Sequence, residues 1–182
     1  MGLKLWGLDQ GWTLFLDRDG VVNERIFDGY VLKSDDFHFT YKALEALRLA
    51  HSMFNRIILV TNQQCVALEL ISLPALQEIH QHMLTEIEAN GGRIDAVFAA
   101  IELKKDPDNR RKPKPAMAFE AKNIFPEIDF SKSIMVGDTD GDLNFGKNLG
   151  MRTVLVQSAE MVSVTPDLVV GSLYEFILSL CE

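Results

Sequence analysis

Phe15–Asn23 reads FLDRDGVVN, and this stretch decides the fold of the chain. The apolar run Leu14–Leu16 ends in two carboxylates, Asp17 and Asp19, and a glycine follows them. In a strand, residues i and i+2 point to the same side, so both acids can leave the strand end toward one point. Two converging carboxylates favour an oxygen-preferring cation such as Mg²⁺. The alternative is a polar turn after a buried strand.

Composition narrows the class of protein. The 182 residues, 47% hydrophobic and 24% charged, predict one globular domain over residues 1–182. A formal net charge of −8 makes nucleic acid an unlikely partner and argues against a membrane surface. Cys65 and Cys181 form no disulfide framework. Met1–Trp6 lacks the apolar core of a signal peptide, so we expect a cytoplasmic protein. We also expect a monomer or a small homo-oligomer.

Short β-rich runs alternate with helical patterns along the chain, which predicts an α/β fold. We expect a three-layer, Rossmann-like parallel sheet with helices on both faces. Its strands are expected at Trp12–Leu16, Arg56–Thr61, Ala96–Glu102, Ser133–Gly137, Arg152–Gln157 and Asp167–Val170. Its helices are expected at Thr40–Met53, Ser72–Asn90, Pro115–Ile124, Asp140–Leu149 and Ser172–Leu180.

Local signals predict how two helices begin and what precedes them. Thr40 and Ser72 are expected N-caps, and Gly91 and Gly92 should end the second helix. Residues 23–39 are expected to form a short hairpin or ordered loop beside the first strand. Because no segment is long enough for a separate lid, the fold should have a minimal cap and an open cleft.

Polar groups follow four of the expected strands. Asp17 and Asp19 follow the first, Thr61-Asn62-Gln63 the second, Arg111-Lys112-Pro113 the third and Gly137–Asp142 the fourth. Open parallel sheets bind ligands at the carboxyl ends of their strands, so these groups should lie together. Each alone is typical of a strand end, a helix cap or a solvated loop. Their combination indicates phosphoryl transfer.

A phosphate ester would give each group a chemical task. Asp17 would be the nucleophile, and Asp19 would protonate the leaving oxygen and then take a proton from water. Thr61 would bind phosphoryl oxygens, and Lys112 would neutralise their charge. Asp138 would complete a Mg²⁺ site, supported by Asp142 from the first turn of a helix.

This ordered set resembles the haloacid dehalogenase superfamily of Mg²⁺-dependent aspartyl phosphatases. The strings in Phe15–Asn23, Gly29–Val31 and Val60–Gln63 look more specifically like the histidinol-phosphatase and heptose-bisphosphate-phosphatase group. The resemblance implies catalysis by Asp17, Asp19 and Lys112. It also implies phosphate or substrate binding by Thr61, Asn62 and Arg111, and a metal held by the Asp17 carboxylate, the Asp19 backbone carbonyl and Asp138.

The chain departs from that group at two loops. Relatives commonly carry a Cys/His zinc-binding loop before the Arg-Lys-Pro triplet, whereas Glu102–Arg111 contains no Cys and no His. Relatives usually continue Thr-Asn-Gln with Ser-Gly and an Arg, whereas this chain has Gln64, Cys65 and then Leu68. We therefore expect a bulkier, less polar entrance to the cleft.

The predicted substrate is a small phosphorylated metabolite, and a heptose-type sugar phosphate is the first choice. The alternatives are histidinol phosphate, a polynucleotide 3′-phosphate that the acidic charge disfavours, and a non-catalytic phosphate-binding relic of the family. Six of the 18 basic residues fall within residues 104–114. We expect a functional role for Arg111 and Lys112 there, and ordinary solvation for Lys104 and Lys105.

Overall fold

One six-stranded parallel sheet forms the centre of the computed structural model, which describes residues 5–181. The strand order is β3-β2-β1-β4-β5-β6, and every neighbouring pair is parallel. The strands are β1 (Thr13–Leu16), β2 (Arg56–Asn62), β3 (Ala96–Ala100), β4 (Ser133–Gly137), β5 (Arg152–Val156) and β6 (Leu168–Val170). All six expected strands are present. β3 stops two residues early because its only partner in the sheet, β2, stops pairing at Asn62.

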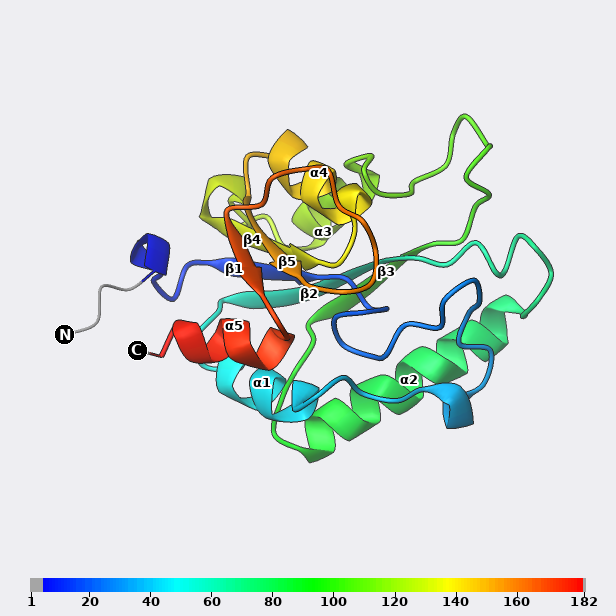
Figure 1. Cartoon of the computed structure of the whole chain (residues 1–182), viewed down its shortest axis with the longest axis horizontal. Helices are drawn as coiled ribbons and strands as arrows, with labels where there is room; N and C mark the ends of the chain where they lie inside the picture. Colours follow the sequence, from blue (N-terminus) through cyan, green and yellow to red (C-terminus); the bar gives the residue numbers. More distant parts are fainter. Residues whose placement is uncertain (1–4, 182) are drawn as a thin grey trace.

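Helices cover both faces of the sheet, as the sequence predicts (Figure 1). One core joins alternate β1 and β2 residues such as Leu14 and Leu59 to the helices on one face. The other core joins Phe15 and Val60 to the helices on the opposite face. The first face carries α1 (Ala43–Ala50), α2 (Leu73–Ala89) and α5 (Leu173–Ser179), and the second carries α3 (Ala116–Ile124) and α4 (Asp140–Asn148).

Burial on both faces explains the continuous apolar strands. Leu14, Phe15, Leu16 and Ile58 have no solvent-exposed surface. Each such side chain contributes about 1.5–3 kcal/mol relative to an exposed one. An alternating pattern would place polar groups against one of the two helical layers, so the central strands are apolar throughout.

Two of the expected helix caps differ in outcome. The Ser72 hydroxyl accepts a hydrogen bond from the Ala75 amide at 3.3 Å, which confirms the predicted N-cap of α2. The prediction for Thr40 is wrong. Its hydroxyl instead donates to the Val21 carbonyl at 2.7 Å, and α1 begins only at Ala43. Thr40 is used to fasten the loop after β1 rather than to cap a helix.

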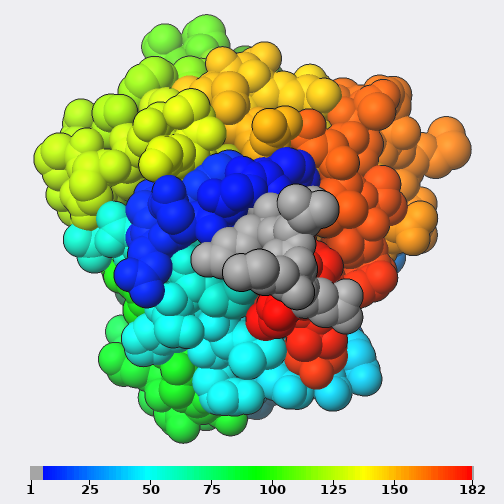
Figure 2. Space-filling view, turned by 90° about the vertical axis from the view of Figure 1, so that its left-hand side faces the viewer, coloured from blue at the N-terminus to red at the C-terminus, as the bar shows by residue number. Residues whose placement is uncertain are grey.

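The ends of the sheet differ in what they expose. Residues 23–39 form a loop that returns beside its own start through an antiparallel bridge between Asn23 and Phe39, with one 3-10 turn at Ser34–Asp36. This loop lies at the carboxyl ends of the strands. Figure 2 shows the opposite face, where the blue N-terminal segment of the described chain lies between the yellow-green segment around α3 and the cyan segment around α1.

Among residues 5–181, no helix is both long and apolar enough to cross a bilayer. Residues 1–4 of Met1–Trp6, on which the expected lack of a signal peptide depends, lie outside the described residues.

Candidate functional site

Three carboxylates meet where β1 and β4 end. Leu16 and Val136 are partners in the sheet, and the Asp17 amide continues the ladder to the Val136 carbonyl at 2.9 Å. Asp17 is therefore level with Gly137, and Asp138 follows one residue later. One oxygen each from Asp17, Asp138 and Asp142 lies within 4.8 Å of the others. The acids that the sequence separates by more than a hundred residues are thus brought to one point.

Gly20 makes room for Asp138. It has a φ of +90°, a conformation that favours glycine, and a Cβ at this position would overlap the Asp138 carboxylate. Gly137 does the same for Asp142, whose Cβ would overlap any side chain there. Both glycines of the predicted motifs are therefore required by close approach to an acid.

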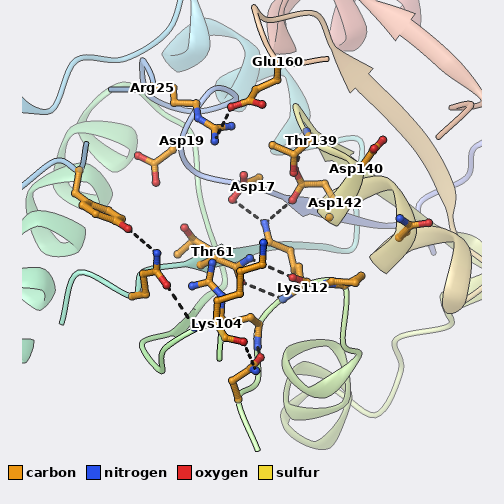
Figure 3. A pocket seen from close by; sticks show the side chains of 18 of the residues that line it. Asp17, Asp19, Arg25, Thr61, Lys104, Lys112, Thr139, Asp140, Asp142 and Glu160 are labelled. Carbon is orange, nitrogen blue, oxygen red and sulfur yellow. Dashed lines mark hydrogen bonds and ion pairs between the residues drawn. The ribbon is translucent and has the colours of Figure 1, made fainter. Parts of the chain in front are cut away.

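Lys112 lies between Asp17 and Asp142 (Figure 3). Its ammonium is 2.7 Å from Asp17 Oδ1 and 2.6 Å from Asp142 Oδ1, and it donates to the Val60 carbonyl at 2.7 Å. Asn62 holds the loop that carries the lysine, because its side chain bonds both the amide and the carbonyl of Lys112. The predicted motif residues of β2 and of the basic loop therefore meet at Asp17.

Burial and nearby charges shift the pKa values of Asp17, Asp138 and Lys112. Burial, followed by the nearby Asp142 charge, raises the pKa of Asp17 to about 8 although Lys112 opposes the shift. Burial and Asp142 also raise the pKa of Asp138 to about 6. Burial opposes a higher pKa for Lys112, but Asp142 and Asp17 raise it. Lys112 pairs with Asp17 and Asp142, and Arg25 pairs with Asp138, so two cations face three carboxyl groups and an excess of negative charge remains when all three ionise.

Asp138 offers a buried free oxygen to the cluster. Its Oδ1 is buried and has no hydrogen-bond partner, while its Oδ2 accepts from Arg25 at 3.0 Å. Asp142 is different, because Lys112 occupies its Oδ1 and Thr139 donates twice to its Oδ2. An unpartnered buried carboxylate oxygen beside Asp17 fits a hard divalent cation. Asp142 fits the supporting position.

Asp19 lies apart from the Lys112 cluster and is held by its own donors (Figure 3). Its Oδ1 accepts from Arg18 at 2.9 Å and from Asn23 at 3.0 Å, and its Oδ2 accepts from Gln63 at 2.7 Å. Burial opposes ionisation of Asp19. The Arg18 charge and the three hydrogen-bond donors nevertheless lower its pKa.

Sequence reasoning missed several residues of this site. Arg18 is fully buried and also contacts His80 Nε2 at 3.1 Å. Arg25 bridges Asp138 and Glu160, with its Nη2 3.1 Å from Glu160 Oε1. Arg18 lies between Asp17 and Asp19 in the Phe15–Asn23 motif, and this position was a sequence signal for a place in the site. Nothing in the sequence marks Arg25 or Glu160.

The remaining predicted residues line a cavity of about 830 Å³ that opens above the cluster. Thr61 is buried and accepts from Gln63 at 2.8 Å, which leaves its own hydroxyl proton free to donate. Arg111 reaches the cavity with a buried Nη1 that has no partner, and burial lowers its pKa. Asn62, Asp17, Asp19 and Lys112 share the same cavity wall.

The entrance to the cavity is more polar than expected. Gln64 donates to the Tyr30 hydroxyl at 2.8 Å and accepts from the Lys104 amide at 3.3 Å, and all three line the cavity. Cys65 is buried beneath the turn, and Leu68 is not part of the lining. The expectation of a less polar entrance is therefore wrong, because consecutive residues of this turn point in different directions.

Comparisons with known proteins agree on one kind of enzyme. A family model described as HAD-hydrolase-like matches residues 109–176. D-glycero-beta-D-manno-heptose-1,7-bisphosphate 7-phosphatase of Vibrio cholerae is 32% identical over 159 residues, 83% of this chain and 84% of the relative. D-glycero-alpha-D-manno-heptose-1,7-bisphosphate 7-phosphatase of Mycobacterium tuberculosis is 29% identical over 172 residues, 92% of this chain and 90% of the relative.

A solved structure is similar over nearly the whole chain. It is the D,D-heptose 1,7-bisphosphate phosphatase of B. bronchiseptica in complex with magnesium and phosphate. The TM-score is 0.85 with 28% identity, and the alignment covers 93% of this chain and 98% of that one.

Proposed function

Because the chain belongs to the D,D-heptose 1,7-bisphosphate phosphatase group of the haloacid dehalogenase (HAD) phosphatases, we propose that it hydrolyses a phosphate ester of a small sugar. A heptose bisphosphate is the leading candidate, since the relatives from V. cholerae and M. tuberculosis are named for that substrate. The cavity suits a small molecule, and basic side chains at its rim suit an anionic one. Mg²⁺ is the proposed cofactor.

Asp17 is the proposed nucleophile. It attacks phosphorus, the bond to the sugar oxygen breaks, and an aspartyl phosphate forms. Lys112, 2.7 Å from Asp17, orients the attacking oxygen and offsets the charge on the phosphoryl group. The single observation that carries this proposal is that ion pair, buried at the floor of an open cavity beside the unpartnered Asp138 oxygen.

The metal would be held by the carboxylates of Asp17 and Asp138 and by the Asp19 backbone carbonyl. When bound, Mg²⁺ supplies positive charge that stabilises the ionised nucleophile and the phosphoryl oxygens. Asp17 and Asp138, the two carboxyl groups whose pKa values burial raises, would gain from such a charge.

Asp19 is the proposed general acid and base. It gives its proton to the leaving sugar oxygen and then takes one from the water that cleaves the aspartyl phosphate, so each turnover restores it. Thr61 and Asn62 bind the reacting phosphate from the end of β2. Arg111 contacts the rest of the substrate, and its unpartnered Nη1 is available for an anionic or hydroxyl group.

Hydrolysis by metal-stripped protein, with and without added Mg²⁺, tests this proposal. Suitable substrates are heptose 1,7-bisphosphate, histidinol phosphate, a 3′-phosphorylated oligonucleotide and p-nitrophenyl phosphate. We expect Mg²⁺-dependent turnover with the heptose bisphosphate preferred. Asp17→Asn should reduce turnover at least about 1,000-fold, because it removes the nucleophile.

Asp36→Asn is the matched control, since Asp36 is exposed and outside the cavity. It should keep parental turnover. Equal rates for Asp17→Asn and the parent would refute the enzymatic proposal and favour a non-catalytic phosphate-binding protein. Preference for histidinol phosphate or for the oligonucleotide would refute the sugar substrate alone.

A further inference from the structure

One buried amide links the proposed acid to the proposed phosphate site. Gln63 follows β2 and has no exposed surface. Its Nε2 donates to Asp19 Oδ2 at 2.7 Å and to Thr61 Oγ1 at 2.8 Å. We propose that Gln63 is a positioning residue that aligns Asp19 for proton transfer relative to the phosphate-binding end of β2. This inference rests on the proposed function.

The other donors to Asp19 cannot provide that alignment. Arg18 and Asn23 belong to the same loop as Asp19, and both donate to Oδ1. Neither contacts the phosphate-binding end of β2, because Arg18 otherwise contacts His80 of α2 and Asn23 otherwise donates to the Glu24 carbonyl. Gln63 stands at the end of a different strand and donates to Oδ2. Its backbone is also fixed, because its amide donates to the Ala100 carbonyl at 2.7 Å.

The chemistry of an amide suits this position. The NH₂ group of glutamine has two donor hydrogens, and here one serves Asp19 and the other serves Thr61. Thr61 thus accepts from Gln63 and keeps its own proton for a phosphoryl oxygen. On Asp19, Oδ2 has one donor whereas Oδ1 has two, so Oδ2 is the oxygen with room to carry the transferred proton.

The orientation of the amide is determined by its surroundings. Gln63 Oε1 faces the Cys65 thiol, with Sγ 3.6 Å away. A reversed amide would point its oxygen at the Asp19 carboxylate and leave two acceptors facing each other. The Gln63 side chain therefore has one favourable orientation, and that orientation points both hydrogens at the two catalytic groups.

The proton transfer balances with Asp19 as the carrier. In the first step the Asp17–phosphorus bond forms, the phosphorus–oxygen bond to the leaving group breaks, and Asp19 gives that oxygen its proton. In the second step water attacks phosphorus, Asp19 takes a proton from it, and Asp17 is released. Gln63 contributes no proton to either step. It fixes the direction of Asp19 Oδ2, the oxygen that gives and takes the proton.

A series of substituted phenyl phosphates tests this role. The value of kcat/KM covers the steps up to release of the phenol, and a basic phenol needs a proton more than p-nitrophenol does. In Gln63→Met, the ratio of kcat/KM for p-nitrophenyl phosphate to that for phenyl phosphate should rise about tenfold. Asp19→Asn should raise this ratio further, and adding Gln63→Met to Asp19→Asn should not change it again.

Gln64→Met is the matched control. It makes the same substitution one residue along, where the amide bonds Tyr30 and the Lys104 amide instead of Asp19. Its ratio should equal that of the parent, whatever happens to the individual constants. Gln63→Asn, which keeps an amide but shortens the side chain, is a second variant in case Gln63→Met folds poorly. The ratio is unaffected by an unfolded fraction, because both substrates are assayed on the same sample.

Three outcomes would overturn the inference. A parental ratio in Gln63→Met and Gln63→Asn, with a raised ratio in Asp19→Asn, would remove the positioning role and leave the proposed function intact. An equal rise in Gln64→Met would assign the effect to general disturbance of the turn. A parental ratio in Asp19→Asn would refute the acid assignment of the proposed function together with the inference.

Discussion

The molecule contains two similar charge groups in very different surroundings. Lys112 lies between Asp17 and Asp142, and Arg110 lies between Glu102 and Glu120. The shortest separations are alike, 2.6 Å in each group. The Lys112 side chain is 1% exposed, whereas the Arg110 side chain is 33% exposed. Distance alone therefore does not distinguish the two groups, and burial does.

Burial changes what the same ion pairs do. Water screens the Arg110 group, so pairs of this kind contribute only about 0–1 kcal/mol. The Lys112 group is buried, so its charges are screened less and interact more strongly, and removing one partner leaves the others buried and unpaired. Only the buried group shifts a carboxyl pKa as far as about 8. In the proposed function the Lys112 group takes part in catalysis, whereas the Arg110 group joins the loop after β3 to Glu120 of α3.

Lys112→Met gives the largest expected effect on this comparison. It removes the charge that Asp17 and Asp142 share, so the free energy of unfolding should fall by about 3–5 kcal/mol. Turnover should fall at least about 100-fold, because the charge on the phosphoryl group is no longer offset. Urea unfolding and steady-state kinetics measure the two effects. Lys105→Met, on an exposed lysine of the same loop, should change neither. Parental values in Lys112→Met would show that burial does not separate the groups.

His80 allows a pH experiment that extends the comparison to Arg18, the buried cation that it contacts. Burial, followed by the Arg18 charge, lowers the pKa of His80 to about 4 from an ordinary value of 6.5. Between pH 6.5 and 4, His80 binds a proton in the unfolded chain but stays neutral in the folded chain, so the free energy of unfolding falls as pH falls toward 4. At pH 5 this loss is on the order of 2 kcal/mol.

His80→Gln should remove that component of acid sensitivity. The measurement is urea unfolding of parent and variant at pH 7.5 and pH 5. The parent should lose about 2 kcal/mol more than the variant between these two values, since glutamine does not titrate in this range. Equal losses in both proteins would mean that His80 is protonated as easily in the folded state as in the unfolded one.

Arg110→Met gives the smallest expected effect. It removes the bonds to Glu102 and Glu120 and one to the Ala99 carbonyl, all near the surface. The free energy of unfolding should fall by about 1 kcal/mol, and 0.5 M salt should reduce the difference, because salt screens exposed charges. A loss as large and as salt-insensitive as that of Lys112→Met would contradict the distinction between the two groups.

The sequence predicts the acids around Lys112 because the ends of the predicted strands determine where those acids lie. Asp17 and Asp138 directly follow β1 and β4, Lys112 lies in the loop between β3 and α3, and parallel strands bring their carboxyl ends to one edge. Contacts made by side chains of the loops depend on loop conformation instead. Arg25 reaches Asp138 across 113 positions, and no pattern in a loop specifies such a contact. The predicted polarity of the cavity entrance is wrong for the same reason, because the turn at Gln64–Leu68 has no periodicity that indicates which side chains face the cavity.

The bond between the Lys112 ammonium and the Val60 carbonyl has a practical consequence. The same nitrogen also contacts Asp17 after β1 and Asp142 in α4, so its three hydrogens are shared among three separate segments of the backbone. A chain in which any one of these segments has not docked cannot complete the arrangement. If Lys112 acts as proposed, specific activity reports the correctly assembled fraction of a preparation, which a signal for helix content does not.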